Sequence, residues 1–203
     1  MADRIPIFPL HSLLLPHVDL GIHVFEDRYR SLVAHSLSNG HTFGVVLIER
    51  GCEVGGPAQP HQVGTLAHIS GYARLPDGRY LLEVEGTRRF RIESRIEKGD
   101  YPTARVTWLT ESIGNFAGAR AASNDVAQLF HLYRARSGDG DLPVHLPVDP
   151  VTRSYLVASL LRIDLPEKQR LLEAETAEDR LRLARTILRR EIAVLDHLLS
   201  KRG

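Results

Sequence analysis

Ten histidines and a single cysteine, Cys52, are the side chains with which this sequence could bind a metal ion. Three histidines near the N-terminus are spaced by six residues, which places no two of them on one face of a helix. No His-Glu-x-x-His occurs. Cys52 could form a partial site with His61 and His68, but scattered histidines and a loop cysteine are usually surface residues. We expect no metal site, no cofactor and, with one cysteine, no internal disulfide.

Nucleophiles and phosphate-binding loops are the second kind of chemistry to consider. None of the three lysines (Lys98, Lys168, Lys201) follows a glycine, so there is no phosphate-binding Gly-Lys-Ser/Thr loop. No Gly-x-Gly-x-x-Gly opens a helix, and no Gly-x-Ser-x-Gly elbow occurs. Composition alone leaves a Ser–Lys dyad open, but no serine has a lysine in a recognisable motif. We therefore expect a protein without catalytic activity.

A cluster of arginines is the best candidate for binding an anion. Its members are Arg88, Arg89, Arg91 and Arg95. They could contact phosphates, or they could lie on a solvated strand face and pair with Glu83, Glu85 and Glu93. The second interpretation is favoured, because unlike charges on neighbouring strands are an ordinary surface arrangement. In addition, 26 basic residues against 25 acidic ones give a net charge of only +1. Nucleic acid is accordingly not the expected partner.

The elements before residue 115 show mostly strand periodicity. Residues 63–75 alternate strictly between two faces, Pro76-Asp77-Gly78 forms a turn, and inward-facing residues return from Tyr80 onward. Residues 27–37 are predicted to form one helix with a single buried face, and 43–48 a strand buried on both faces. About six or seven strands and this helix would close a small antiparallel or mixed β-barrel over residues 1–114.

The remaining residues, 115–203, show helical periodicity. Helices are predicted over 117–136, 151–163, about 165–173, and from a Thr176 cap to the C-terminus. The last is long and carries an apolar stripe from Leu181 to Leu199. The fold class is therefore α+β, a barrel followed by a helical subdomain. No apolar run approaches 18 residues, so we expect a soluble, cytoplasmic protein.

Five short motifs, in order, resemble the N-terminal domain of Lon proteases. They are Ile5-Pro-Ile-Phe-Pro-Leu10, Ile22-His-Val-Phe-Glu-Asp-Arg-Tyr-Arg30, Val63-Gly-Thr65, Leu75-Pro-Asp-Gly-Arg-Tyr80 and Val84-Glu-Gly-Thr-Arg-Arg-Phe90. Leu146-Pro-Val-Asp-Pro150 and later motifs are similar to its helical portion. The resemblance implies a PUA-like barrel and a non-catalytic module that recognises unfolded or degron-bearing polypeptides, or a specific protein partner. We expect neither the ATPase nor the peptidase of Lon in this chain.

Within these motifs, most residues are expected to specify the fold. Glu26 would cap the helix and pair with an arginine, and the glycines would fit turns or bulges. This structural group comprises Glu26, Arg28, Tyr29, Gly64, Asp77, Gly78, Gly86, Arg89 and Phe90. The candidate polypeptide-binding residues are Leu13, Leu14, Leu15, Tyr72 and Leu75. By analogy with other PUA-like barrels, RNA binding is the alternative. The sequence carries no signal for an oligomeric state.

Overall fold

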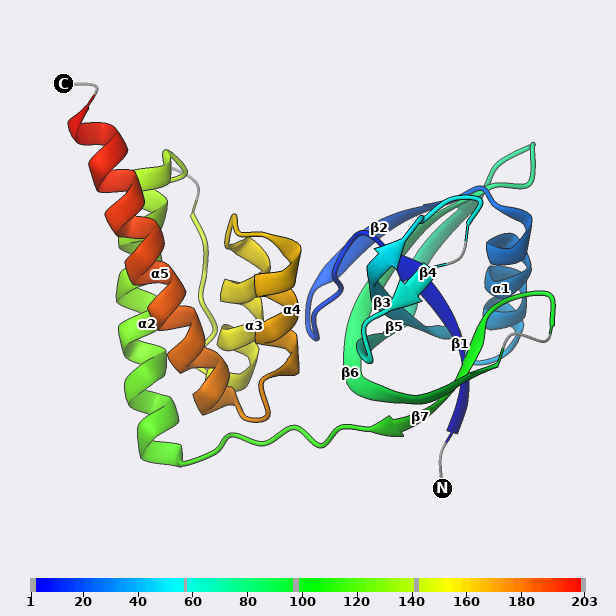
Figure 1. Ribbon diagram of the computed structural model, residues 1–203, viewed down its shortest axis with the longest axis horizontal. Coiled ribbons are helices and arrows are strands. Elements are labelled where there is room, and N and C mark those ends of the chain that lie inside the picture. The colour runs from blue at the N-terminus through cyan, green and yellow to red at the C-terminus, as the bar shows by residue number, and fades with distance from the viewer. Residues whose placement is uncertain (1–2, 57, 97–98, 141–142, 202–203) are drawn as a thin grey trace. The chain divides into compact units, whose positions relative to one another are not determined.

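The computed structural model describes residues 3–56, 58–96, 99–140 and 143–201. The chain divides into two compact units, Met1–Thr110 and Glu111–Gly203. The first holds strands β1–β7 and helix α1, and the second holds helices α2–α5 (Figure 1). This agrees with the predicted α+β class.

In the described residues, the first unit is a barrel with seven strands. In chain order these are β1 (Asp3–Leu10), β2 (Asp19–Val24), β3 (Thr42–Gly51), β4 (Ala58–Pro60), β5 (Val63–Arg74), β6 (Tyr80–Ile96) and β7 (Thr103–Trp108). Neighbours run β1-β7-β6-β5-β3, and a parallel pairing of β3 with β1 closes the ring. The other neighbouring pairs are antiparallel, so the barrel is mixed. Strand β2 pairs with β6, and β4 pairs with β3.

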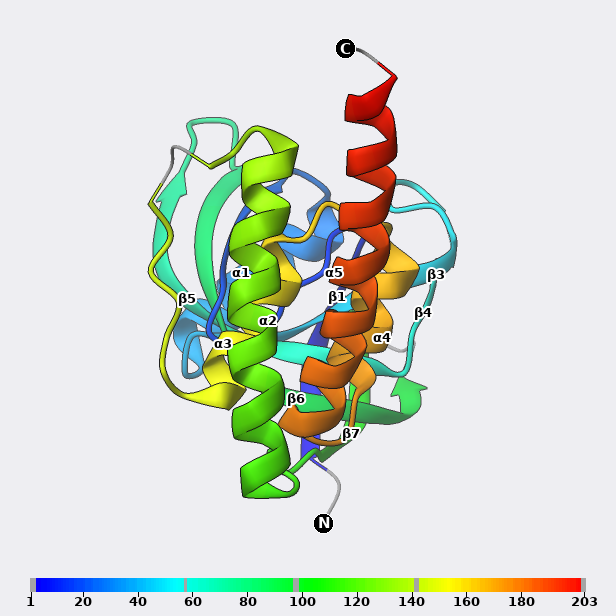
Figure 2. The ribbon, with the colours of Figure 1, turned by 90° about the vertical axis from the view of Figure 1, so that its left-hand side faces the viewer.

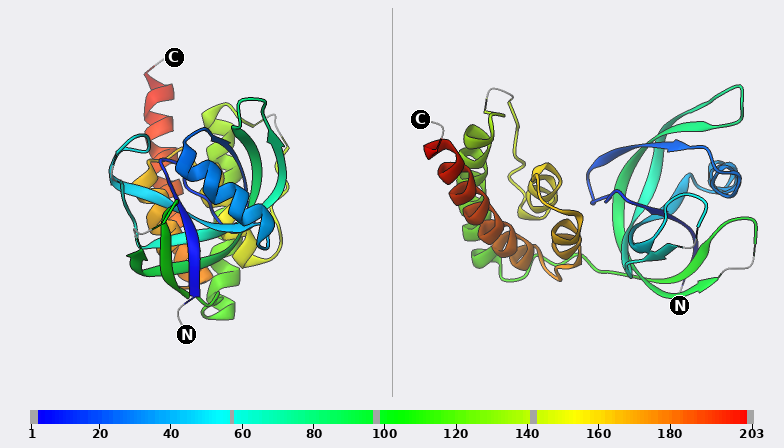
Figure 3. Two further views of the ribbon diagram at one scale, coloured as in Figure 1. Left: turned by 90° about the vertical axis from the view of Figure 1, so that its right-hand side faces the viewer. Right: turned by 45° about the horizontal axis from the view of Figure 1, so that its top comes forward.

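Helix α1 (Asp27–Ser38) lies across the barrel strands, as the left panel of Figure 3 shows. Tyr29, Leu32 and Val33 are buried, at the i, i+3, i+4 spacing that the sequence predicts. They join one core cluster with Phe8 and Phe43, and the Phe8 and Tyr29 rings stack with centroids 4.1 Å apart. A second cluster surrounds the Phe90 ring. Successive β1 residues, such as Ile7 and Phe8, face different clusters because side chains alternate along a strand.

Strands β5 and β6 form a long hairpin at Pro76-Asp77-Gly78, as predicted. Gly78 has a φ of +86°, which favours glycine. Asp77 accepts hydrogen bonds from the backbone N–H of Arg79 at 3.1 Å and from its Nε at 2.7 Å. These bonds, the backbone one foremost, lower the pKa of Asp77. The strand predicted from Tyr80 onward continues through Phe90 to Ile96, because a register shift near Gly86 absorbs the change of periodicity.

The second unit contains α2 (Phe116–Ser137), α3 (Pro150–Leu160), α4 (Leu165–Glu173) and α5 (Ala177–Ser200). Helices α2 and α5 lie side by side and run in the same direction (Figure 2). Arg185 pairs with Asp125 at 3.0 Å, and Arg136 pairs with Asp196 at 2.6 Å. Thr176 caps α5 by accepting the Asp179 N–H, as predicted.

A buried arginine organises the centre of the helical unit. Arg180 is fully buried and donates to the Leu171 carbonyl at 3.0 Å, to Ser154 Oγ at 2.9 Å and to Glu111 Oε1 at 3.1 Å. Its guanidinium carbon lies 3.7 Å from the centroid of the Tyr155 ring. The interaction with Glu111 ties the start of this unit to α5.

The segment after β7 belongs to the helical unit. The N–H groups of Ala177 and Glu178 donate to the carbonyls of Ser112 and Ile113 at 2.8 and 3.1 Å. Asn115 donates its N–H to Glu178 Oε2 at 2.9 Å. These bonds explain why the division falls after Thr110, whereas the sequence analysis placed it after residue 114. The short strand β4 is a further element that the sequence analysis does not predict.

Candidate functional site: a pocket in the barrel unit

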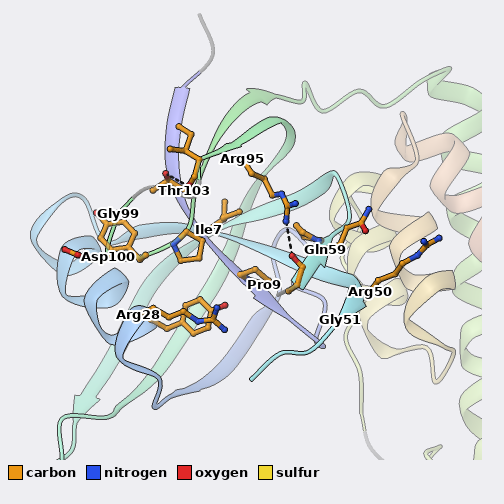
Figure 4. Close-up of a pocket in the computed structure, with 16 residues that line it drawn as sticks. Ile7, Pro9, Arg28, Arg50, Gly51, Gln59, Arg95, Gly99, Asp100 and Thr103 are labelled. Atoms are coloured by element: carbon orange, nitrogen blue, oxygen red, sulfur yellow. Dashed lines mark hydrogen bonds between the residues drawn. The ribbon is translucent and has the colours of Figure 1, made fainter. Parts of the chain in front are cut away.

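A pocket of about 660 Å³ opens in the barrel unit, within the size range of ligand sites. Its walls come from β1, the start of α1, the end of β3, β4, the end of β6 and the residues before β7 (Figure 4). The lining residues are Ile7, Pro9, Arg28, Tyr29, Arg50, Gly51, Ala58, Gln59, Pro60, Arg95, Ile96, Gly99, Asp100, Tyr101, Pro102 and Thr103. The site therefore combines aliphatic, proline and tyrosine side chains with three arginines.

The start of α1 supplies the wall around Tyr29. Arg28 pairs with Glu26 at 3.1 Å, donates to the Glu53 carbonyl at 3.5 Å, and has its guanidinium carbon 4.5 Å from the centroid of the Tyr29 ring. Burial raises the pKa of the Tyr29 phenol. The hydroxyl is consequently protonated at neutral pH, and no hydrogen-bond partner for it exists in the described part of the chain. It is a donor available to an acceptor in the pocket.

The opposite wall is formed by Arg95, Arg50 and Gln59. Arg95 Nη1 donates to the Ala58 carbonyl at 2.9 Å, which holds the end of β6 to the edge strand β4. Arg50 and Gln59 are exposed, and Figure 4 places them at the opposite end of the labelled set from Arg28 and Asp100. With Asp100 as the single acid among the lining residues, the formal charge of the lining is positive.

Two prolines lie on strand edges that face the pocket. The Ile7 N–H donates to the Pro102 carbonyl at 3.0 Å, and backbone groups two residues apart on a strand point to the same side. The edge of β1 at Pro9 therefore faces the pocket without an N–H. Pro60 likewise ends the edge strand β4. Proline blocks continuous strand pairing at such edges, so a bound chain must rely on side-chain donors and apolar contact.

The structure corrects part of the predicted polypeptide-binding set. Leu14 and Leu15 are each only 1% exposed, because this segment is packed into the barrel unit, where the Leu14 carbonyl accepts from Thr65 Oγ1 at 2.7 Å. They are core residues in this structure and offer no surface to a partner. Leu13 and Leu75 are half-buried, and Tyr72 is 56% exposed. None of these residues lines the pocket.

Most of the family-motif residues have structural roles in the barrel. Phe90 is fully buried, Gly64 lies where a Cβ would meet the Val45 carbonyl, and at Gly86 a Cβ would meet the Leu15 carbonyl. Glu26 is the N-cap residue of α1, but its side chain makes no capping bond because it pairs with Arg28. This part of the expectation was wrong.

Three other motif residues differ from what the sequence predicts. Arg89, expected on a solvated face with its arginine neighbours, is only 3% exposed and lies opposite the buried Thr65. Arg28 and Tyr29, expected to be purely structural, line the pocket. The other lining residues, including Arg50, Gln59 and Tyr101, were missed. They come from loops and strand ends that carry no periodic signal, although the prolines at 9, 60 and 102 mark strand edges.

The comparison with known families decides what this arrangement belongs to. Residues 4–190 match the family described as the ATP-dependent protease La (LON) substrate-binding domain. The chain belongs to the Lon substrate-binding domain family. The match includes both the barrel and most of the helical unit, so the resemblance expected from the five motifs is confirmed.

Individual relatives give the same result. "Lon protease 2" of Desulfotalea psychrophila is 29% identical over 97% of this chain, and "Lon protease" of Azorhizobium caulinodans is 27% identical over 96%. The chain spans 26% and 24% of those proteins, about a quarter of their length. The part matched is thus the substrate-binding domain.

Solved structures confirm the fold. A Lon N-terminal domain protein from Xanthomonas campestris has 26% identity and a TM-score of 0.65, covering 89% of this chain and 95% of that one. The N-terminal domain of Mycobacterium avium complex Lon protease has 18% identity and a TM-score of 0.68, covering 94% and 98%. The RNA-binding alternative finds no support in these relatives.

Two further properties of the described residues bear on other kinds of site. They contain no group of three or more histidine, cysteine, aspartate or glutamate side chains arranged to hold a metal ion. Among the helices of these residues, none combines the length and apolar character needed to cross a membrane.

Proposed function

We propose that this protein is a non-catalytic substrate-recognition module that binds unfolded or degron-bearing polypeptide segments in the barrel pocket. The pocket is the single observation that carries this proposal, and membership of the Lon substrate-binding domain family supports it. An extended segment would place one apolar side chain between the prolines and tyrosines of the lining. Burial of a leucine-sized side chain contributes about 1.5–3 kcal/mol, enough for weak binding.

The donors of the pocket suit the backbone of such a segment. A bound chain presents carbonyl oxygens, and the Tyr29 hydroxyl and the Arg50 guanidinium are donors with no bonded partner among the described residues. Pro9 and Pro60 prevent the segment from pairing as an added strand. Recognition would therefore depend on one apolar anchor and a few donors, which is compatible with many sequences.

A role in polypeptide binding stays a prediction for three residues outside the pocket. Two lie near the turn of the β5–β6 hairpin, and one lies before β2. Leu13, Tyr72 and Leu75 would contact parts of the polypeptide outside the pocket. Tyr72 is exposed and the two leucines are half-buried, so the three form no large apolar patch and would add modestly to affinity. A specific folded partner is the other kind of polypeptide that this surface could bind.

The test is binding of a fluorescein-labelled, reduced and alkylated casein fragment, followed by anisotropy. The pocket variant is Arg50→Ala with Tyr101→Ala. The matched control is Arg74→Ala with Tyr72→Ala, which removes the same residue types from the exposed hairpin. We expect the pocket variant to bind about tenfold more weakly and the control less than about threefold. Circular dichroism checks that both variants are folded.

Loss of binding in the control but not in the pocket variant would move the site to the hairpin. Equal affinity in all three proteins would exclude both surfaces. Failure of the unmodified protein to bind the fragment at any concentration up to its solubility limit would contradict the proposal itself.

A further inference from the structure

Three arginines lie on the outer face of neighbouring strands of the barrel. Arg4 on β1 is directly opposite Arg105 on β7, and Arg91 on β6 is directly opposite Thr107 on β7. All three arginines are exposed, while the intervening Ala104 and Val106 are buried. The alternation places Arg105 and Thr107 on one face, so Arg91 is a diagonal neighbour of Arg105. Arg4, Arg91 and Arg105 are called the arginine strip below.

The arginine strip has no ion-paired carboxylate among the described residues, although the exposed Glu93 lies two residues from Arg91 on β6. None of the three guanidinium groups makes an ion pair or hydrogen bond within the described part of the chain. The expected pairing of Arg88 and Arg91 with Glu83, Glu85 or Glu93 is not found among those residues. Asp3, the neighbour of Arg4, instead accepts a hydrogen bond from Trp108 Nε1. Like charges directly opposite on paired strands are destabilising, so the strip lowers the stability of the isolated barrel.

Half-buried arginines of the barrel unit are paired with carboxylates: Arg28 with Glu26, Arg30 with Asp27, and Arg79 with Asp77. The exposed Arg50, Arg74 and Arg88 have no ion pair among the described residues, as in the strip. The strip differs from them in its arrangement, because Arg4 and Arg105 lie directly opposite each other on neighbouring strands.

We propose that the arginine strip binds an acidic run in the polypeptide whose apolar segment occupies the pocket. This inference rests on the proposed function, because it names a preferred class of substrate. The strip continues directly from the pocket: Arg105 is two residues from the lining residue Thr103, and Ser94, opposite Arg105, precedes the lining residue Arg95. Two strand residues span about 7 Å, so acidic side chains about two to four positions from the apolar anchor would reach the strip.

The surface fits an acidic polypeptide better than a single-stranded nucleic acid. Nucleic-acid binding of that kind combines positive charge with aromatic rings on which bases stack. The strand positions opposite Arg91 and Arg105 are Thr107 and Ser94, which offer no ring. Trp108 faces the other way, with Phe90 against its edge and the Arg88 guanidinium carbon 4.6 Å from its centroid.

The test uses three labelled peptides: an apolar segment flanked by four glutamates, the same segment flanked by four glutamines, and a glutamate-rich peptide without the apolar segment. The strip variant is Arg4→Gln, Arg91→Gln and Arg105→Gln. The control carries Arg120→Gln, Arg170→Gln and Arg189→Gln, three exposed arginines of the helical unit. Affinities are measured at about 50 mM and about 500 mM salt, because exposed charges are screened at the higher value.

We expect the unmodified protein to bind the glutamate-flanked peptide about fivefold more tightly than the glutamine-flanked one at low salt, and equally at high salt. The strip variant should lose this preference and keep its affinity for the glutamine-flanked peptide. The control should retain the preference. Weak, salt-sensitive binding of the glutamate-rich peptide should also depend on the strip alone.

The outcomes separate the two proposals. In one outcome, the glutamate-rich peptide binds and depends on the strip, but the glutamine-flanked peptide does not bind. This outcome would support the role of the arginine strip and reject binding in the pocket. A preference that survives in the strip variant, or is lost equally in the control, would overturn the inference. So would tighter strip-dependent binding of a single-stranded RNA of equal charge than of the acidic peptide.

Discussion

The ring of Phe90 lies directly over the backbone of Gly44. A Cβ atom at position 44 would come within 2.6 Å of Phe90 Cζ and 3.0 Å of the Ile5 methyl carbon Cδ1. Phe90 is fully buried, and Val46, Ala104 and Val106 surround it in the same cluster. This second core cluster is thus filled by one large ring that requires a residue without a side chain on β3.

We predict that Gly44→Ala destabilises the protein by about 1–3 kcal/mol, because the added methyl overpacks a filled core. Phe90→Leu alone should cost about 1–3 kcal/mol through the space that it leaves. The three atoms nearest to a Cβ at position 44 all belong to side chains. The double variant should therefore lose less stability than the sum of the two single losses, by about 1 kcal/mol or more. Urea unfolding measures all three free energies.

Gly64 provides the control for this pair. There a Cβ would meet both the Phe90 ring at 2.8 Å and the Val45 carbonyl oxygen at 2.5 Å. Backbone cannot move aside as a side chain can, so Phe90→Leu should not rescue Gly64→Ala. Equal rescue at both positions would contradict this account of the barrel interior.

The buried Arg180 should be the most sensitive charged residue of the helical unit. Arg180→Ala leaves the Leu171 carbonyl and Ser154 without their donor and removes a partner of Glu111. We expect a loss of about 3–5 kcal/mol, as for other broken buried ion pairs. Arg189→Ala, at an exposed position of the same helix, should cost less than about 0.5 kcal/mol. Denaturation followed by helical circular dichroism distinguishes the two, and similar losses would refute the assigned role.

The Glu167–Arg190 pair predicts a dependence of stability on pH. Both carboxylate oxygens accept from Arg190 at 2.7 Å, and this interaction lowers the pKa of Glu167 from its usual 4.5. Because the pKa of Glu167 is lower in the folded state, its ionised carboxylate stabilises the fold at pH values above the unfolded-state pKa. This stabilisation is lost as the pH falls through the folded-state pKa. Because the pair is partly solvated, we expect about 0.5–1 kcal/mol. Glu167→Gln should remove that acid-dependent part of the unfolding free energy, and an unchanged pH profile would argue against it.

Much of the fold could be predicted because local periodicity and tertiary burial agree. Tyr29, Leu32 and Val33 follow helical spacing and are buried, and residues 43–48 form a strand with both faces covered. The division between units was less predictable, since residues 111–114 are held by backbone bonds to α5, more than sixty positions away. The buried charge of Arg180 follows from the same kind of distant contact and has no local signature.

The candidate site was predicted only in part, for the same physical reason. Leu14 and Leu15 form an apolar run that composition cannot distinguish from an exposed patch, yet packing buries both. The pocket joins residues from β1 to β7 that are separated by up to about a hundred positions, and no one segment carries its pattern. Arg28 and Tyr29 were identified as motif residues, but their place on the pocket wall depends on how α1 meets β1.

The central claim is that polypeptide binds in the barrel pocket, and the most direct measurement is an NMR titration of the ¹⁵N-labelled protein with the glutamine-flanked apolar peptide. We expect saturable chemical-shift changes at the amides of Arg50, Gly51, Gln59 and Tyr101, with smaller changes at Tyr72. Shifts confined to the β5–β6 hairpin or to the helical unit, with the pocket amides unchanged at saturation, would contradict the account.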